Sequence, residues 1–420
     1  MKIDSSKILH STRIRPKILF VASAQSSHTH SWIDLLKNSN FDVRVFGISG
    51  TIAPADFPFK IISTGISHTS SWLPRYSRWR IAKTSRALLD DTLRFKFLNC
   101  MARSFGQSAE WFAESEEELL AHVILSWKPD IIHTFGIESA SFLYFRVLNR
   151  FRLKGIGAWV VTALGGSDFE PVRHDPVYKE NIASILKECD SFIADCDISY
   201  QYAIELGLDD SKIIPRGKTP GTGGVNIDTL RSSRKNLPSQ QRTILFPKAY
   251  ECLYSKALPV LEALVSCWDK ITPCTIHMTA IDNETYQWYL ALPQKIRLSC
   301  RIEKRIPRNK LLQLMAKSRI VLAPTLVDGF PNSLYEAMAT GAFPIFSPLD
   351  SFKNILKEGE NILFARNLYP NEIAAALVRG MNDDALVDRA FEQNLTLVRE
   401  LADRDTIAVD VINFYQSLVN

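Results

Sequence analysis

The stretch KILFVASAQSSHTHSW, residues 17–32, followed by FDVRVF at 41–46, decides the fold of this chain. Its first six residues are a short apolar run, and a loop of small polar residues comes next. Trp32, Leu35 and Leu36 then recur at helical spacing before the second apolar run begins. The order strand, loop, helix, strand is the opening unit of a parallel α/β sheet.

Similar continuous apolar runs recur along both halves of the chain. Such runs are expected when helices cover both faces of a sheet. They lie at 129–133, 158–163 and 191–195 in the first half and at 243–246, 275–279, 319–323 and 343–346 in the second. Two successive series of this kind predict an α/β protein with two Rossmann-like, doubly wound parallel-sheet domains that face a cleft.

A segment rich in proline and glycine, about 215–242, separates the two series. Residues of this kind mark loops and connections between folded units. We therefore expect an N-terminal domain at 1–220, a linker at 221–241 and a C-terminal domain at 242–404. The last helix, about 405–420, is free to pack back on the N-terminal domain.

Composition places the chain among soluble globular proteins, since 46% of its 420 residues are hydrophobic and 23% are charged. A formal net charge of +5 suits anionic partners such as sugar nucleotides or a lipid surface. Without a long basic run, nucleic acid is not an expected partner. The seven cysteines show no metal-ligand spacing and are typical of reduced thiols, so we expect no metal site and a cytoplasmic location.

No apolar stretch approaches the length of a bilayer span, so any membrane contact would be peripheral, at the inner face. The segment at about 65–118 interrupts the α/β alternation and mixes tryptophan, tyrosine and arginine. It is predicted to be helical, and two interpretations stay open. It is either an ordinary helical excursion with a solvated charged face or an element that binds a membrane surface or an acceptor.

The stretch DGFPNSLYEAMATG, residues 328–341, carries the strongest chemical signal. It follows an apolar strand, a helix is predicted to begin near Asn332 or Ser333, and Gly341 is placed to end it. The free N–H groups at a helix start lie here at the carboxyl edge of a parallel sheet, where a pyrophosphate is the natural ligand.

Two acidic residues of this stretch, Asp328 and Glu336, could touch one extended ligand. Glu336 could accept both hydrogen bonds from the cis-diol of a ribose, and Asp328 could hold sugar hydroxyls. Simpler structural roles remain open for both residues. Ser333 and Glu336 also have the spacing of a capping box, and Asp328 could be a turn residue.

This stretch resembles the Glu-x7-Glu region of the family-4, group 1 glycosyltransferases, which are retaining enzymes of the GT-B fold, in the subset where Asp replaces the first Glu. The resemblance extends over most of the chain. It includes SHTHSW at 27–32, PDIIH at 129–133, GSD at 166–168, GVN at 224–226, FPI at 343–345 and EGEN at 358–361.

The resemblance implies a role for each matching position. Glu336 would bind the nucleotide ribose, while Asp328 and its neighbours would hold the donor sugar and diphosphate. Those neighbours are Gly329, Phe330, Pro331, Asn332 and Ser333. His133 would face the cleft near the transferring sugar, although a strand-end histidine satisfied by packing is the alternative. The N-terminal side of the cleft would be formed by Ser23, Ala24, Gln25, His28, Gly166, Ser167 and Asp168.

The chain departs from the family pattern at the residues that neutralise the diphosphate. Lys248 stands where an Arg is usual, so it would act as a point charge without a bidentate fork. Lys256 is the candidate for the second cation, but Ser255 fits the spacing about as well, and Lys256 could be a solvated surface residue. Asn226 occupies a position where Asp is usual.

Together these observations predict a metal-independent hexosyl or related transferase, with Asp328, His133 and Lys248 as its catalytic residues. It would need no cofactor beyond a nucleotide-diphosphate sugar donor. The resemblance implies a glycan, glycolipid or small-molecule acceptor, an N-terminal acceptor domain, and a context in cell-envelope polysaccharide assembly. Two alternatives are a catalytically silent sugar-nucleotide-binding subunit and a GT-B fold sugar-nucleotide epimerase.

Overall fold

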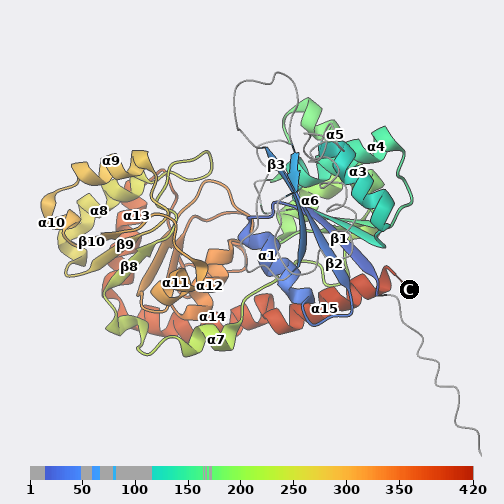
Figure 1. Ribbon diagram of the computed structural model, residues 1–420. Helices are drawn as coiled ribbons and strands as arrows, with labels where there is room; N and C mark the ends of the chain where they lie inside the picture. The colour runs from blue at the N-terminus through green and yellow to red at the C-terminus, as the bar shows by residue number, and fades with distance from the viewer. Residues whose placement is uncertain are drawn as a thin grey trace, which may run out of the picture.

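A computed structural model describes residues 15–48, 59–66, 79–81, 116–163, 165, 168–169 and 173–419. These residues form two α/β lobes joined along one side by the last two helices (Figure 1). Each lobe is built around a parallel sheet with the strand order of a doubly wound domain.

The N-terminal sheet has the order β4-β3-β2-β1-β5-β6-β7 within the described residues. Its strands are β1 (Lys17–Ala22), β2 (Asp42–Gly47), β3 (Lys60–Ile66), β4 (Trp79–Ile81), β5 (Ile131–Phe135), β6 (Ala158–Thr162) and β7 (Ser191–Ile193). All neighbours pair in parallel except β3 and β4, which are antiparallel.

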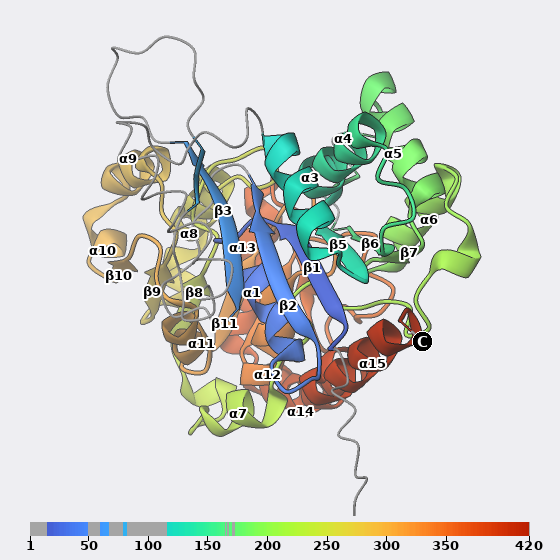
Figure 2. The ribbon, with the colours of Figure 1, turned by 45° about the vertical axis from the view of Figure 1, so that its right-hand side comes forward.

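Helices cover both faces of this sheet. On one face lie α3 (Glu116–Trp127), α4 (Phe142–Phe151), α5 (Pro176–Glu188) and α6 (Asp197–Glu205), over a core that includes Leu19, Ile132 and Val161 (Figure 2). On the other face lie α1 (Ser27–Ile33) and the C-terminal helix α15 (Arg404–Ser417). The continuous apolar strands are thus buried on both sides, as their sequences predict.

The C-terminal sheet has the order β10-β9-β8-β11-β12-β13 in the described part of the chain. Its strands are β8 (Thr243–Phe246), β9 (Thr275–Met278), β10 (Cys300–Ile302), β11 (Ile320–Ala323), β12 (Phe343–Phe346) and β13 (Leu363–Phe364). Helices α8 (Leu258–Ile271), α9 (Asn283–Ala291), α10 (Gln294–Arg297) and α13 (Pro370–Asn382) pack over one face. The other face is covered by α7 (Ile227–Ser232), α11 (Arg308–Met315), α12 (Asn332–Thr340) and α14 (Asp384–Ala402).

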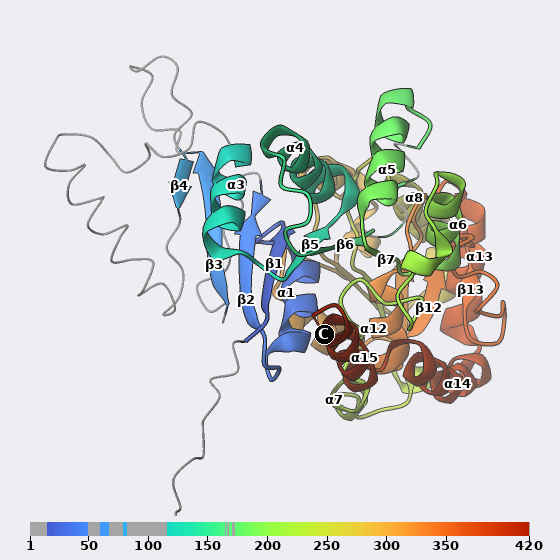
Figure 3. The same cartoon turned by 90° about the vertical axis from the view of Figure 1, so that its right-hand side faces the viewer.

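The chain passes between the domains at two places that lie side by side. The Val225 N–H donates to the Ala402 carbonyl at 2.9 Å, and the Arg404 N–H donates to the Val225 carbonyl at 3.2 Å. Beyond this point α15 packs on the N-terminal domain, where the Trp32 indole N–H donates to the Tyr415 hydroxyl at 3.0 Å. Figure 3 shows α15 at the base of the molecule, next to α1.

Several expectations from the sequence are met, and some are not. Helix α12 begins at Asn332 and ends with Gly341 in the left-handed region, as predicted. The segment expected to be a linker contains α7, which packs with α12 and α14 of the C-terminal domain. Most of the segment at 65–118 lies outside the described residues, and its part at Trp79–Ile81 is a strand where a helix was expected. In the described ranges, no helix combines the length and apolar character needed to cross a membrane.

Candidate functional site

Lys248 and Asp328 meet at the carboxyl edge of the C-terminal sheet. Strands β8 and β11 are neighbours, so the loops that follow them are brought together. The Lys248 ammonium lies 2.6 Å from Asp328 Oδ2, and both side chains are half-buried. Burial alone would lower the Lys248 pKa, but the Asp328 carboxylate and nearby groups outweigh it and raise that pKa. Lys248 therefore stays protonated and paired with Asp328 at the edge where α/β domains bind ligands.

The loop from Asp328 to Pro331 is held by contacts within the C-terminal domain. The Phe330 ring is buried and stacks on Tyr335, with ring centroids 4.2 Å apart and planes 5° apart. The Ser351 hydroxyl donates to the Gly329 carbonyl at 2.8 Å and to the Asp328 carbonyl at 3.2 Å. The buried Phe330 ring thus anchors the loop to the C-terminal domain. The loop backbone lies at the carboxyl edge of the sheet.

The start of α12 has no side-chain cap. Its N-cap residue is Pro331, so the Ser333 and Glu336 capping box considered for this helix does not form. The Ser333 hydroxyl is buried and has no hydrogen-bond partner among the described residues. A helix start without a side-chain cap, with an unpaired hydroxyl beside it, is suited to an anion.

Glu336 is buried, and its carboxylate forms a hydrogen-bonded ion pair with Arg308, the first residue of α11. Arg308 Nε donates to Glu336 Oε1 at 2.9 Å, and Nη2 lies 2.7 Å from the same oxygen. Burial raises the pKa of Glu336, and Arg308 opposes that rise. Arg308 is not recognisable from the sequence, because no local pattern links it to Glu336, which lies 28 positions further along the chain.

Two residues of the N-terminal domain, Gly165 and Asp195, lie against the loop at Gly329. A Cβ built on Gly329 would lie 2.6 Å from both Asp195 Oδ1 and Gly165 Cα, and closer still to Asp195 Oδ2. Only glycine fits at this contact. Burial raises the pKa of Asp195 to about 7, the Cys196 side chain opposes the rise, and Asp328 adds to it. Asp195 was not predicted, although an acidic residue after a buried strand is a recognisable signal.

His28 is the histidine that faces this corner from the N-terminal domain. Burial lowers its pKa, Asp328 opposes that shift, and Arg308 and Lys248 reinforce it. Its Nδ1 is buried without a hydrogen-bond partner among the described residues. His28 at the start of α1 thus lies close to the charged groups of the C-terminal domain.

The expectation that His133 faces the cleft is wrong. It lies in the middle of β5 and is fully buried. Its two ring nitrogens contact the Tyr415 and Thr162 hydroxyls, each at 2.6 Å, and aromatic rings surround it. Burial lowers its pKa to about 3, so His133 is a neutral core residue in this structure.

The other residues predicted for the cleft have varied surroundings. Ser23, Ala24 and Gln25 form the turn after β1, where the Ala24 carbonyl accepts a hydrogen bond from the His30 ring. Asp168 accepts from the Ile137 N–H at 3.3 Å and so braces its own domain. Gly166 and Ser167 lie outside the described residues.

On the C-terminal side, Asn332 and Lys256 also have defined partners. The Asn332 side-chain oxygen accepts from the Thr222 hydroxyl at 2.6 Å. The Lys256 ammonium lies 3.4 Å from Glu251, so in this structure its charge is directed at that carboxylate.

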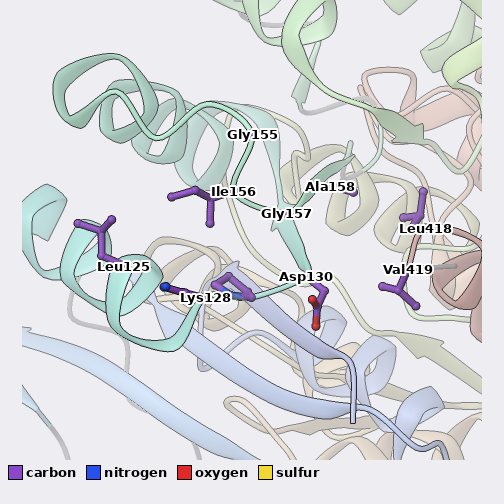
Figure 4. Close-up of a pocket in the computed structure, with 10 residues that line it drawn as sticks. Leu125, Lys128, Asp130, Gly155, Ile156, Gly157, Ala158, Leu418 and Val419 are labelled. Carbon is purple, nitrogen blue, oxygen red and sulfur yellow. The ribbon is translucent and has the colours of Figure 1, made fainter. Parts of the chain in front are cut away.

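A separate pocket of 820 Å³ lies at the opposite edge of the N-terminal sheet, where β5 and β6 begin (Figure 4). Leu125, Lys128, Asp130 and Leu418 are among its lining residues, and none of the predicted site residues is. Among the residues that the structure describes, no cluster of His, Cys, Asp and Glu side chains could hold a metal ion.

Comparisons with known proteins agree with this architecture. Residues 261–383 match the family model described as Glycosyl transferases group 1. A search of curated proteins gave no match. Among solved structures, HepE from Anabaena in complex with UDP-glucose is similar over 96% of this chain and 99% of that one, at 13% identity and a TM-score of 0.65.

Two further structures show the same likeness. Sucrose-phosphate synthase from Thermosynechococcus elongatus is 15% identical, with 96% of this chain and 99% of that one covered and a TM-score of 0.66. A putative UDP-N-acetylglucosamine 2-epimerase from Listeria monocytogenes is 10% identical, with 96% of each chain covered and a TM-score of 0.60. The chain thus has the two-domain GT-B fold, and its group 1 glycosyltransferase match lies within the C-terminal domain.

Proposed function

We propose that this chain is a retaining glycosyltransferase that moves a sugar from a nucleotide-diphosphate donor to an acceptor hydroxyl. One observation carries the proposal. Lys248, Asp328 and Glu336 converge with the uncapped start of α12 at the carboxyl edge of the C-terminal sheet. Lys248 and the start of α12 offer a cation and N–H groups to a diphosphate. Asp328 and Glu336 offer carboxylates to the hydroxyls of the sugar and of the ribose, which flank the diphosphate.

In the proposed complex, the ribose hydroxyls bind Glu336 and the diphosphate lies between Lys248 and the start of α12. The bond between the anomeric carbon and the diphosphate breaks, and negative charge builds on the departing phosphate. Lys248 and the helix N-terminus stabilise that charge without needing a divalent ion. Asp328 holds sugar hydroxyls, and the N-terminal domain excludes water from the reacting centre.

Retention follows if the acceptor oxygen attacks from the face that the diphosphate leaves. Its bond to the anomeric carbon forms as the donor bond breaks, and its proton passes to the departing phosphate oxygen. The acceptor class is proposed as a glycan, glycolipid or small molecule, in cell-envelope polysaccharide assembly at the cytoplasmic face of the membrane. Most of the segment at about 65–118, for which binding to a membrane surface or an acceptor was one of two open interpretations, lies outside the described residues.

The comparisons support the donor class. Residues 261–383 match the group 1 glycosyltransferase model. HepE, which shares the fold, was solved with UDP-glucose. The similarity to a putative UDP-N-acetylglucosamine 2-epimerase favours epimerisation of a nucleotide sugar as the second candidate function.

The test begins with a thermal-shift screen of UDP-, GDP- and dTDP-sugars, because a ligand of the native state raises the melting temperature. A donor that stabilises the chain is then incubated with and without a panel of glycan and lipid-linked acceptors. Transfer with retained anomeric configuration supports the proposal. An epimer formed without an acceptor supports the second candidate, and binding without turnover across the panel points to a silent subunit. Failure of every nucleotide sugar to bind would reject both enzymatic functions.

A further inference from the structure

Arg308 spans the two domains from the first turn of α11. Its Nε and Nη2 groups contact Glu336 Oε1, at 2.9 and 2.7 Å. Its Nη1 group donates to the Ser31 hydroxyl in α1 of the N-terminal domain at 3.3 Å. One guanidinium thus connects the proposed ribose carboxylate with the opposite side of the cleft.

Ser31 is itself tied to the place where the chain passes between the domains. Its hydroxyl donates to the Thr222 carbonyl at 2.7 Å. Arg404 Nη2 donates to the Ser31 carbonyl at 2.6 Å and to Asp34 Oδ2 at 3.1 Å. The Arg308 side chain therefore ends in a polar network that includes both crossing segments.

The charge on Glu336 depends on Arg308. Glu336 is only 5% exposed, and burial penalises its ionised form. Arg308 is the charged group that opposes this penalty. Among the other charged or titratable groups of the corner, burial aside, the pKa of Lys248 after β8 is shifted mainly by Asp328 after β11, and that of His28 from α1 is shifted by Asp328, Arg308 and Lys248. Burial lowers the pKa of Arg404, on the other side of Ser31, and the Arg308 charge adds to that shift. Without Arg308, Glu336 would take up a proton more readily, and a protonated carboxyl loses acceptor capacity.

Both contacts from Arg308 to the carboxylate fall on Oε1. The guanidinium therefore fixes the orientation of the carboxylate without needing its second oxygen. A buried carboxylate that is ionised and fixed in this way is prepared to accept hydrogen bonds from the hydroxyls of a ribose.

We propose that Arg308 is a positioning residue for the nucleotide, which holds Glu336 ionised and oriented for the ribose diol and links that site to Ser31 of the N-terminal domain. The inference rests on the proposed function, because it takes Glu336 as the ribose-binding residue. It adds a specific partner for that residue and a direct link from the nucleotide to the domain interface.

The test measures the affinity of the full chain for UDP and GDP by calorimetry between pH 6 and pH 8.5. The variants are Arg308→Met, Arg308→Lys, Glu336→Gln and the double variant, with Lys310→Met as the matched control. Lys310 lies in the same helix, is exposed and pairs with Glu303 away from the site. Thermal melts of every variant establish that each chain is folded.

We expect Arg308→Met to weaken nucleotide binding by about tenfold or more at pH 6 and to recover affinity as the pH rises and Glu336 ionises. Arg308→Lys should restore much of the affinity and show little pH dependence, because it keeps the charge. The double variant should bind no more weakly than Glu336→Gln, since Arg308 acts through Glu336.

Affinity of Arg308→Met equal to that of the unmodified chain across the pH range would overturn the inference. The inference would also be overturned if the loss of affinity in the double variant equalled the sum of the losses in Arg308→Met and Glu336→Gln. If the unmodified chain binds neither UDP nor GDP while remaining folded, the ribose-binding role of Glu336 fails, and the inference falls with it. The proposed function itself fails only if every nucleotide sugar of the donor screen also fails to bind.

Discussion

Gly329 of the C-terminal domain lies directly against the carboxyl group of Asp195 in the N-terminal domain. A Cβ on Gly329 would come within 2.6 Å of Asp195 Oδ1 and of Gly165 Cα. The two domains therefore meet at the loop that carries Asp328, where the Gly329 backbone faces the Asp195 side chain and the Gly165 backbone. This close approach sets how near the N-terminal domain can come to the proposed donor site.

Gly329→Ala should hold the domains apart. The added methyl group has no room, because the obstacles are a buried carboxyl group and backbone. We expect turnover in the proposed transfer to fall by about tenfold or more, since misplacement of about 1 Å has effects of that size or larger. The turnover number and melting temperature of the purified variant check this.

Gly380→Ala in α13 is the control, because its new Cβ would meet the terminal methyl of Ile320 at 3.0 Å within one domain. Unchanged turnover in Gly329→Ala would show that this contact does not limit the approach of the domains.

Asp195→Asn should change how stability depends on pH. Burial raises the pKa of Asp195 to about 7, with Cys196 opposing and Asp328 adding to the rise. Between the ordinary value of about 4 and that pKa, the folded chain keeps a proton that the unfolded chain has released, so this group makes stability fall as pH rises. Asparagine is always neutral and lacks this effect.

Between pH 4 and pH 8 the Asn variant should therefore gain about 4 kcal/mol in free energy of unfolding relative to the unmodified chain. The advantage should shrink towards pH 4. Urea unfolding at both pH values measures this difference, and an equal difference at the two values would show that Asp195 does not titrate in the folded chain as proposed.

His133→Ala should lower stability, whereas His28→Ala should lower turnover. His133 is fully buried between the Tyr415 and Thr162 hydroxyls, so its loss leaves a cavity and two unpaired hydroxyls. We expect a loss of about 2–4 kcal/mol in the free energy of unfolding, with transfer by the folded fraction preserved. His28 lies beside the charged groups of the cleft, so His28→Ala should lower turnover with little change in melting temperature. If His133→Ala lowered turnover and His28→Ala lowered stability instead, His133 would again be the candidate catalytic histidine.

Lys248→Met should weaken binding of UDP while leaving uridine binding nearly unchanged. The substitution removes the cation proposed for the diphosphate and leaves Asp328 without its partner at 2.6 Å. We expect the affinity for UDP to fall by about tenfold or more, which corresponds to about 1.4 kcal/mol. Calorimetry with UDP and uridine separates the phosphate contact from the nucleoside contact.

Lys295→Met is the matched control for this lysine, since it removes an exposed ion pair with Asp269 in the C-terminal domain. Equal losses for UDP and uridine in Lys248→Met would indicate general damage to the site and not a diphosphate contact.

Much of the local structure follows from short-range patterns. The apolar runs at 17–22, 243–246 and 343–346 coincide with β1, β8 and β12. The start of α12 and its end at Gly341 follow from turn and capping chemistry within a few residues. Short strands such as β10 and β13, of three and two residues, carry too little pattern to be recognised.

The sequence by itself determined the alternation of strands and helices, the two-domain α/β organisation and the segment at 328–341, because each depends on the order of neighbouring residues. Only the tertiary structure decided which histidine faces the cleft. Residue 133 is enclosed by Tyr415, 282 positions away, while His28 lies near Asp328 of the other domain. It likewise decided that Arg308 binds Glu336 and that Asp195 meets Gly329. Burial and charge at these residues come from chain segments that are distant in sequence, so no local pattern encodes them.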